Sequence, residues 1–150
     1  MPSTSRDDRK APAIAGWREW ARLPTFTEHR IKAKLDTGAK ISAIHAFRIN
    51  EIEEDDGLYA EFYLHPAQKR RRPEVFCRAP VIDRRLIRSS NGAVQERLIV
   101  ESVLRLGRRS WTIEISLANR DDMGFRLLLG RDALRRRVAI DPARSFVLGA

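Results

Sequence analysis

The sequence predicts one mostly β domain, an all-β barrel or sandwich, with a single short helix near the C-terminus. Apolar and polar residues alternate in short runs, which is the period of half-buried strands. Turn-forming residues such as Asp55-Asp56-Gly57 and Ser90-Asn91-Gly92 separate the runs. A length of 150 residues allows one compact core but not two ordinary domains.

The chain divides into a short tail and one domain. Residues 1–15 are polar and charged with little to bury, so they are expected to be a disordered tail before a domain at 16–150. Strands are expected in the alternating runs at 31–35, 58–64, 81–88, 93–100 and 111–117. The helix is expected at 131–137, after Gly130 and before Asp141-Pro142.

A long hairpin is expected where the runs at 81–88 and 93–100 meet at Ser89-Ser90-Asn91-Gly92. The Asn-Gly pair favours a tight turn at its end. The polar, glycine-containing tip suits a mobile flap that closes over an extended ligand. An ordinary surface hairpin is the alternative.

Composition and charge bound the location and the partners. The opening residues lack the apolar core of a signal peptide, and no segment approaches the ~18 apolar residues of a membrane span, so a cytoplasmic protein without membrane contact is expected. The single Cys77 excludes an internal disulfide. Formal net charge is +9, concentrated at 69–72 and 135–137. No helix-turn-helix, zinc-finger spacing or aromatic-rich strand accompanies this charge, so nucleic acid is not the expected partner.

Two motifs carry candidate chemistry. Asp36-Thr37-Gly38-Ala39 follows directly on the strand at 31–35, which puts a carboxylate where a strand ends and a turn begins. Alone this is a weak signal, since Asp, Thr and Gly are common in turns. About ninety residues later the apolar run Leu127-Leu128-Leu129 ends in Gly130 and leads into the short helix.

Together AKLDTGA and LLLGRDAL resemble the paired signatures of retropepsins, in which an apolar strand ending in Gly passes beside the D-T-G loop. GWREWARLP, KAKLDTGAKISAIHA, the RSSNG tip and LLLGRDALRRRVAIDPARSFVLG are similar to a bacterial retropepsin-like aspartic peptidase family. That family was formerly labelled "ATP-dependent zinc protease" and is associated with ATP-grasp glutamate ligases. The resemblance extends from Gly16 to Gly149 and implies a retropepsin-like barrel that hydrolyses peptide bonds.

A site of this kind needs two carboxylates about 3 Å apart that share one proton. The chain has one D-T-G, so the resemblance implies a two-fold homodimer with one Asp36 from each copy as the catalytic pair. Thr37 is then expected to hydrogen-bond across the two-fold axis, and Gly38 to let the backbone approach the substrate. Ala39, in place of a hydroxyl residue, is compatible with a pair that works nearer neutral pH.

By the same resemblance, Gly130 lies beside the loop, and Arg131 ties the helix to the active-site region through an ion pair. Viral members place acidic residues soon after D-T-G-A, whereas this chain has Lys40-Ile41-Ser42. The usual partner of Arg131 is therefore missing, which leaves its role open.

Basic residues near the site point to an acidic substrate. Lys40 follows the D-T-G-A motif, and Arg88 and Arg97 flank a hairpin tip that contains Ser90, Asn91 and Gly92. These residues are candidates for contact with glutamate-rich or acidic peptides. The alternative is that the cations only solvate the surface.

No metal or cofactor is expected. The three histidines and Cys77 form no local ligand spacing, and no glycine-rich phosphate loop is present. His45 lies close enough in sequence to Asp36 to line the site, but a structural role is preferred. Two other functions stay open: a non-catalytic basic β-barrel that binds acidic protein or RNA, and a zinc-dependent peptidase.

Overall fold

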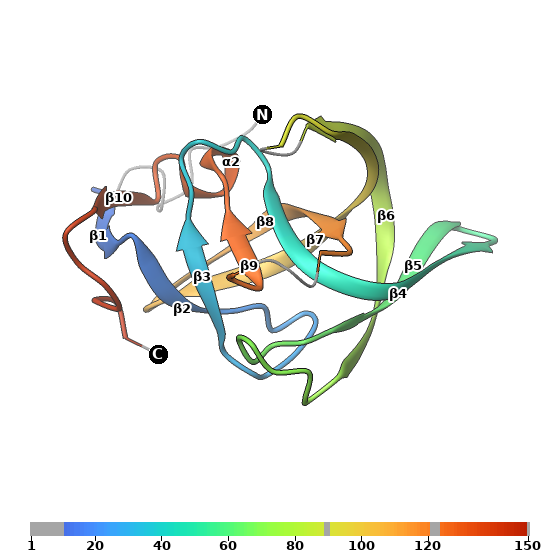
Figure 1. The fold of residues 1–150 in the computed structure, drawn as a ribbon, viewed down its shortest axis with the longest axis horizontal. Coiled ribbons are helices and arrows are strands. Elements are labelled where there is room, and N and C mark those ends of the chain that lie inside the picture. Colours follow the sequence, from blue (N-terminus) through green and yellow to red (C-terminus); the bar gives the residue numbers. More distant parts are fainter. Residues whose placement is uncertain (1–10, 89–90, 121–123, 150) are drawn as a thin grey trace.

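The computed structural model describes residues 11–88, 91–120 and 124–149. Within these ranges the chain forms ten strands and one helical turn (Figure 1). In chain order they are β1 (Ala13–Gly16), β2 (Arg18–Arg22), β3 (Ile31–Leu35), β4 (Ser42–Glu54), β5 (Gly57–Leu64), β6 (Val75–Arg88), β7 (Val94–Leu106), β8 (Arg109–Ala118), β9 (Leu127–Leu129), α2 (Arg131–Leu134) and β10 (Val138–Asp141). The prediction of a mostly β fold with a short helix near the C-terminus is confirmed.

Eight strands form one sheet that folds back on itself. Its order is β2-β3-β9-β4-β5-β6-β7-β8, and two further pairings, β2 with β7 and β4 with β8, join strands that are distant in this order. These pairings leave few free edges, as in a barrel. A separate two-stranded parallel sheet pairs β1 with β10 (Figure 1).

The centre of the fold is the arrangement of β3, β9 and β4. Strand β9 lies between the other two, parallel to β3 and antiparallel to β4. The loop that connects β3 to β4 therefore passes over the end of β9, as Figure 1 shows. This arrangement favours an apolar strand: Leu127 and Leu129 on one face of β9 are fully buried, and Leu128 on the other face is half-buried.

Two long hairpins are formed by strands that follow one another in the chain. Strands β6 and β7 pair from Val81↔Val100 to Arg88↔Val94, which confirms the expected hairpin, although its residues 89 and 90 lie outside the described ranges. A second hairpin of β4 and β5 extends from the body (Figure 1). Its pairing shifts by one residue between Phe47 and Asn50, and Arg48 takes a positive φ of 50° at this bulge.

The core lies inside the folded sheet. Apolar side chains from nearly every strand are buried there, and each fully buried Leu, Ile or Phe contributes roughly 1.5–3 kcal/mol. The largest are Leu23, Ile31, Ile44, Phe62, Leu64, Ile99, Leu104, Ile115, Leu127 and Leu129. No helix in the described ranges is long and apolar enough to cross a membrane.

A buried carboxylate fastens the C-terminal segment to the body. Glu19 on β2 is fully buried, and its Oε2 accepts hydrogen bonds from the backbone N–H groups of Gly16 at 2.7 Å and Val147 at 3.0 Å. Its Oε1 accepts a third from Leu148 at 3.1 Å. Burying a carboxylate is tolerable only with such partners.

Two boundaries differ from expectation. The first strand begins at Ala13, inside the segment expected to be a tail, because β1 pairs with β10 and buries Ala15 completely. The helix ends at Leu134 rather than at Arg137. The chain must turn there to bring β10 beside β1, and Arg136 takes a positive φ of 65° in that turn.

Candidate active site

The Asp36 carboxylate is held by its own loop. The backbone N–H of Asp36 donates to the Leu129 carbonyl on β9 at 2.8 Å, which fixes where β3 ends. Its Oδ1 accepts the N–H of Gly38 at 3.0 Å, and Asp36 remains partly exposed. A Cβ on residue 38 would lie 3.1 Å from this oxygen, so glycine suits the close approach. The arrangement presents a partly exposed, oriented carboxylate.

Gly130 lets β9 pass directly beneath the loop. A Cβ at this position would lie 2.8 Å from the Ile41 carbonyl carbon and the Lys40 oxygen, and 2.9 Å from the Ala39 oxygen. These neighbours are backbone atoms that cannot move aside. The backbone N–H of Gly130 donates to Ser42 Oγ at 3.0 Å. The sequence pattern of an apolar strand ending in glycine thus has a steric cause.

The start of α2 binds the carbonyls of the same loop. The N–H of Arg131 donates to the Ala39 oxygen at 2.8 Å, and the N–H of Asp132 donates to the Lys40 oxygen at 3.0 Å. These N–H groups have no acceptor within a helix, so the loop satisfies them. The loop is therefore held from β9 and from α2.

The role of Arg131, which the sequence left open, is visible in the structure. Its Nη1 donates to the Thr37 carbonyl at 2.8 Å. The acidic partner of viral enzymes is replaced by a backbone carbonyl at the tip of the loop. The Thr37 side chain itself is exposed, and its expected bond across a two-fold axis stays a prediction.

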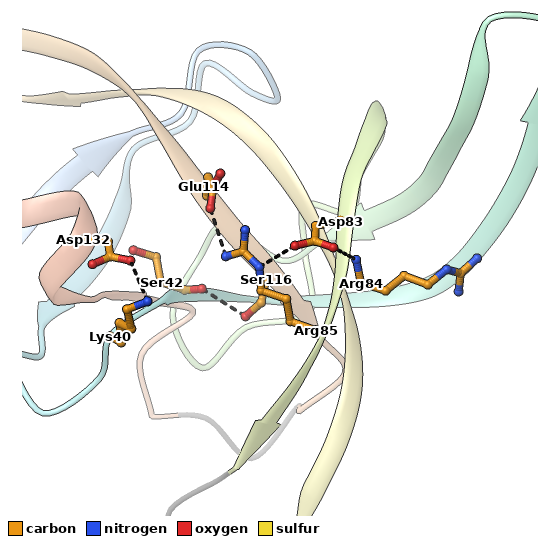
Figure 2. Close-up of polar contacts among 8 residues, drawn as sticks. All are labelled: Lys40, Ser42, Asp83, Arg84, Arg85, Glu114, Ser116 and Asp132. Carbon is orange, nitrogen blue, oxygen red and sulfur yellow. Dashed lines mark hydrogen bonds and ion pairs between the residues drawn. The ribbon is translucent and has the colours of Figure 1, made fainter.

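Lys40 lies beside the loop but forms a loose ion pair. Its Nζ is 3.9 Å from Asp132 Oδ2, and both side chains are exposed (Figure 2). An exposed pair at this distance adds little stability. Lys40 therefore remains able to contact a ligand.

Near the hairpin tip, the described residues are held by local bonds. Asn91 Oδ1 accepts the N–H of Ala93 at 3.0 Å, and Arg88 Nη1 donates to the Gly92 carbonyl at 3.4 Å. Ser90 lies outside the described residues. Arg88 and Gly92 are exposed, so they can meet a ligand only if the hairpin lies over one.

Arg97 lies deeper than its sequence position suggested. It pairs with Arg85 in the hairpin register, three pairs further from the tip than Arg88 and Val94, and only 7% of its surface is exposed. Burial, followed by the charge of Arg120, lowers the pKa of its guanidinium. Its Nε has no hydrogen-bond partner among the described residues. The prediction that Arg97 is a cation flanking the tip is wrong, because Arg97 lies three pairs away from the tip and is buried.

Arg85 is the better-paired cation opposite Arg97. Its Nε is 2.7 Å from Asp83 Oδ2 and its Nη1 is 3.0 Å from Glu114 Oε1. Hydrogen bonds to Asp83 and then to Glu114 raise the pKa of Arg85. Figure 2 shows these contacts on one side of the Ser42–Ser116 bond and the Lys40–Asp132 pair on the other.

The hairpin face that carries Arg97 is linked to the loop through this serine pair. Ser116 on β8 pairs in register with Ile99, two residues from Arg97. Its hydroxyl donates to the Ser42 carbonyl at 3.0 Å, and Ser42 Oγ accepts from Gly130. Strand β7, which carries Arg97, is thus connected to the start of β4, just after the Asp36 loop, through the pairing of Ile99 with Ser116 and the Ser116–Ser42 bond.

The chain matches the family described as RimB-like, retropepsin-like aspartic endopeptidase RimB, over residues 14–149. It belongs to this family. The solved structure of protein Lpg0085 from Legionella pneumophila, titled as of unknown function (DUF785), has a similar fold. Its TM-score is 0.75 and its identity 31%, and the match covers 91% of this chain and 98% of that one.

Curated relatives are longer proteins with a different name. A "Probable alpha-L-glutamate ligase" of Shewanella halifaxensis is 43% identical over 136 residues, which cover 91% of this chain and 30% of that protein. A protein of the same name from Desulfotalea psychrophila is 43% identical over 139 residues, covering 93% and 30%. The chain spans about 30% of the length of the curated relatives it matches.

The RimB-like site contains no metal cluster within the described ranges. No group of three or more His, Cys, Asp or Glu side chains is placed to hold an ion there. His45 is buried on β4, and its Nδ1 accepts the backbone N–H of Arg120 at 3.1 Å. The His45 ring also stacks on that of His65, with centroids 5.4 Å apart, as a packed structural histidine does.

A pocket of about 620 Å³ lies next to the loop, but Asp36 does not line it. Thr37 and Arg131 form its polar edge. The rest is mainly apolar: Trp17, Leu35, Leu134, Val138, Ile140 and Pro142, with Arg135. Its place at the loop tip, between α2 and β10, makes it a candidate interface rather than a catalytic pocket.

Several site residues were missed from the sequence. The contact between Ser42 and Ser116 arises because β4 pairs with β8, and the contact between Arg85 and Glu114 reaches from β6 across β7 to β8. Ser42, six residues after Asp36, gives no signal of its own. Strand order would be needed to find these contacts.

Proposed function

We propose that this chain is a homodimeric aspartic endopeptidase in which the two Asp36 carboxylates activate water. The observation that carries the proposal is the clamped loop. Asp36 is partly exposed, Gly38 orients its carboxylate, and β9 and α2 hold the loop at Leu129, Gly130 and Arg131. Precise placement of a reacting group is worth several kcal/mol of the activation barrier.

The chemistry requires one proton on the carboxylate pair. The ionised Asp36 of one copy accepts a proton from water, and the water oxygen attacks the carbonyl carbon of the peptide bond. The protonated Asp36 of the other copy donates its proton to the carbonyl oxygen. The tetrahedral diol collapses when the amide nitrogen takes a proton and the C–N bond breaks, which releases an acid and an amine. The pair titrates as a unit.

The apolar pocket beside Thr37 supports a second copy as the source of the other carboxylate. An apolar surface at the tip of the loop, next to a residue that resembles the two-fold threonine of retropepsins, suits an isologous interface. Sedimentation that finds only monomer at all working concentrations would contradict the mechanism.

We further propose that the substrate is an acidic or glutamate-rich peptide. Lys40 lies beside the loop, and Arg97 is a buried cation whose Nε is without a partner among the described residues. A substrate carboxylate would supply the missing acceptor and relieve the cost of a buried unpaired charge. The relatives named glutamate ligases make glutamate-containing substrates a reasonable class to test.

The test is a mass-spectrometric cleavage assay with wild type and Asp36→Asn. The peptide panel includes oligoglutamate-tailed sequences and matched oligoglutamine controls, scanned from mildly acidic to neutral pH. Cleavage that disappears in Asp36→Asn supports the proposal, and preference for glutamate over glutamine supports the substrate class. Equal cleavage by both proteins overturns the mechanism.

A zinc-dependent peptidase predicts a different result in the same assay. It would lose activity with a chelator and regain it with zinc, whereas the proposed mechanism is indifferent to both. Adding a chelator to the assay therefore distinguishes the zinc-dependent mechanism from the aspartic mechanism without another variant.

A further inference from the structure

Three aromatic side chains form one row across the sheet away from the Asp36 loop. Phe47 on β4 pairs in register with Tyr63 on β5, and Tyr63 pairs with Phe76 on β6. Ring centroids are 5.7 Å apart for the first pair and 5.4 Å for the second. Each of the three strands contributes one ring to the row, so the row exists only when the strands are paired.

The row faces outward. The residues before Phe47 and Tyr63 and after Phe76 are Ala46, Phe62 and Cys77, and all three are buried. Since alternate residues of a strand point to opposite faces, the aromatic row lies on the outer face. Phe76 is 51% exposed, so part of its ring is open to solvent.

Cations lie close to this row in the structure and in the chain. Lys69, Arg70, Arg71 and Arg72 occupy the connection between β5 and β6 and are all exposed. The guanidinium of Arg48, turned by the β4 bulge, lies 5.3 Å from the Phe47 ring centre and 5.4 Å from that of Tyr63. Positive charge and aromatic surface are thus adjacent.

A shallow pocket joins the two features. Its volume is about 280 Å³, and it is lined by Phe47, Arg48, His65, Arg71, Glu74, His45 and Asn119. Phe47 and His65 stack with centroids 4.1 Å apart at its base. Glu74 pairs with Arg48 at 3.4 Å, which still leaves further N–H donors on that guanidinium.

We propose that this surface, the aromatic row with Arg48 and the cations at 69–72, binds single-stranded nucleic acid. Unpaired bases stack on exposed aromatic rings, and the adjacent cations contact the phosphates. An acidic protein would use the cations but has no need of three rings in register. A duplex hides the faces of its bases. The site shares no residue with the Asp36 loop, β3 or β9, so it is independent of the proposed peptidase activity.

The first test is fluorescence anisotropy with labelled strands of roughly ten nucleotides. Single-stranded RNA, single-stranded DNA of the same sequence, the duplex and an oligoglutamate peptide are compared with the full chain. Tighter binding of single strands than of duplex or peptide supports the proposal, and the RNA-to-DNA ratio identifies the source. Equal or tighter binding of duplex or oligoglutamate overturns it, as does the absence of binding at about 100 mM salt.

Phe76→Ala separates stacking from general charge attraction. This exposed side chain can be removed without opening the core, and the dissociation constant for single strands is expected to rise roughly tenfold. Leu86→Ala is the matched control, since Leu86 is 73% exposed on the same strand, near the β6–β7 tip. Unchanged affinity in Phe76→Ala overturns the proposal.

A charge variant locates the phosphate contacts. Arg71→Gln with Arg72→Gln should flatten the dependence of log K on log salt by about 0.7 for each lost contact. Arg135→Gln with Arg136→Gln removes the same charge elsewhere, and a slope equally flattened there overturns the assignment of this surface. Asp36→Asn should bind as wild type, which keeps this result distinct from failure of the peptidase proposal.

Discussion

Arg131 Nη1 donates a 2.8 Å hydrogen bond to the Thr37 carbonyl, so the first residue of α2 holds the tip of the loop that carries Asp36. The N–H of the same residue binds the Ala39 carbonyl at 2.8 Å. One residue thus fixes the loop at two points on the C-terminal side of Asp36. No ion pair of the viral type is needed, because a backbone carbonyl also accepts a hydrogen bond from a guanidinium, although the bond is weaker than one to a carboxylate.

Arg131→Gln should weaken catalysis more than stability. The side chain is exposed, so its loss should change the unfolding free energy by less than about 1 kcal/mol. A displaced loop should lower kcat by roughly tenfold with KM little changed. Arg108→Gln, in the exposed turn between β7 and β8, is the control. A variant with wild-type kcat would show that Arg131 does not position Asp36.

Gly130→Ala should destabilise the fold severely for a single methyl group. The new Cβ would meet three backbone atoms of the Asp36 loop within 2.9 Å, and backbone cannot rotate away. The expected cost is about 2 kcal/mol or more, measured by urea unfolding. Gly124→Ala is the matched control, because nothing lies within 4 Å of a Cβ there. Equal costs at both positions would show that β9 does not press against the loop.

Glu19→Gln should loosen the C-terminal segment. The amide replaces an oxygen that accepts N–H bonds with a group that donates them, so at least one buried N–H among Gly16, Val147 and Leu148 loses its partner. The expected loss is about 2 kcal/mol of unfolding free energy. Glu101→Gln, on the exposed side of β7, should change it by less than about 0.5 kcal/mol. Faster amide exchange at 147–148 would locate the effect.

Local pattern was sufficient for much of the fold. The alternation of apolar and polar residues predicted β3 at 31–35, which are its observed bounds, and the Asn-Gly turn predicted the β6–β7 hairpin. Ala13 was placed in the tail because four small or apolar residues next to a charged stretch do not predict a strand. Its partner β10 is more than a hundred residues away, and only that pairing makes β1 a strand.

The sequence predicted the site residues that belong to one motif. It did not predict those that come together only through the pairing of distant strands. Gly38 and Gly130 stand where a larger side chain would clash with the Asp36 loop, so the glycines in the sequence mark the place of Asp36. The burial of Arg97 follows from its place on β7 beside β8, and the sequence around it reads as an exposed, charged strand. The aromatic row escaped notice for the same reason.

Arg97→Met should separate stability from specificity. Replacing a buried cation with an apolar side chain of similar length removes a desolvation cost, so the unfolding midpoint should equal or exceed that of wild type. If Arg97 binds substrate carboxylates, the ratio of kcat/KM for glutamate over glutamine peptides should fall roughly tenfold. Arg105→Met, at an exposed position on the same strand, is the control. A lower midpoint with unchanged preference would assign Arg97 a purely structural role.

Cys77 should be inert in the folded chain. Burial raises the pKa of its thiol from an ordinary value of 9.0 to about 12, and only 4% of the residue is exposed. At pH 8 the thiolate population falls roughly a thousandfold, so iodoacetamide should label unfolded but not native protein, as intact mass would show. Rapid native labelling would mean that β6 opens near Cys77.

The same shift fixes the sign of a pH effect on stability. The folded chain holds the Cys77 proton more tightly than the unfolded chain, so this contribution is fully present below about pH 9. It is lost progressively as pH rises toward 12. The difference in unfolding free energy between wild type and Cys77→Ala should therefore shrink across that window, whereas other titrating groups cancel in the comparison. A difference that stays constant from pH 8 to about 11 would show that the thiol is not desolvated by the packing of β6 against Phe26.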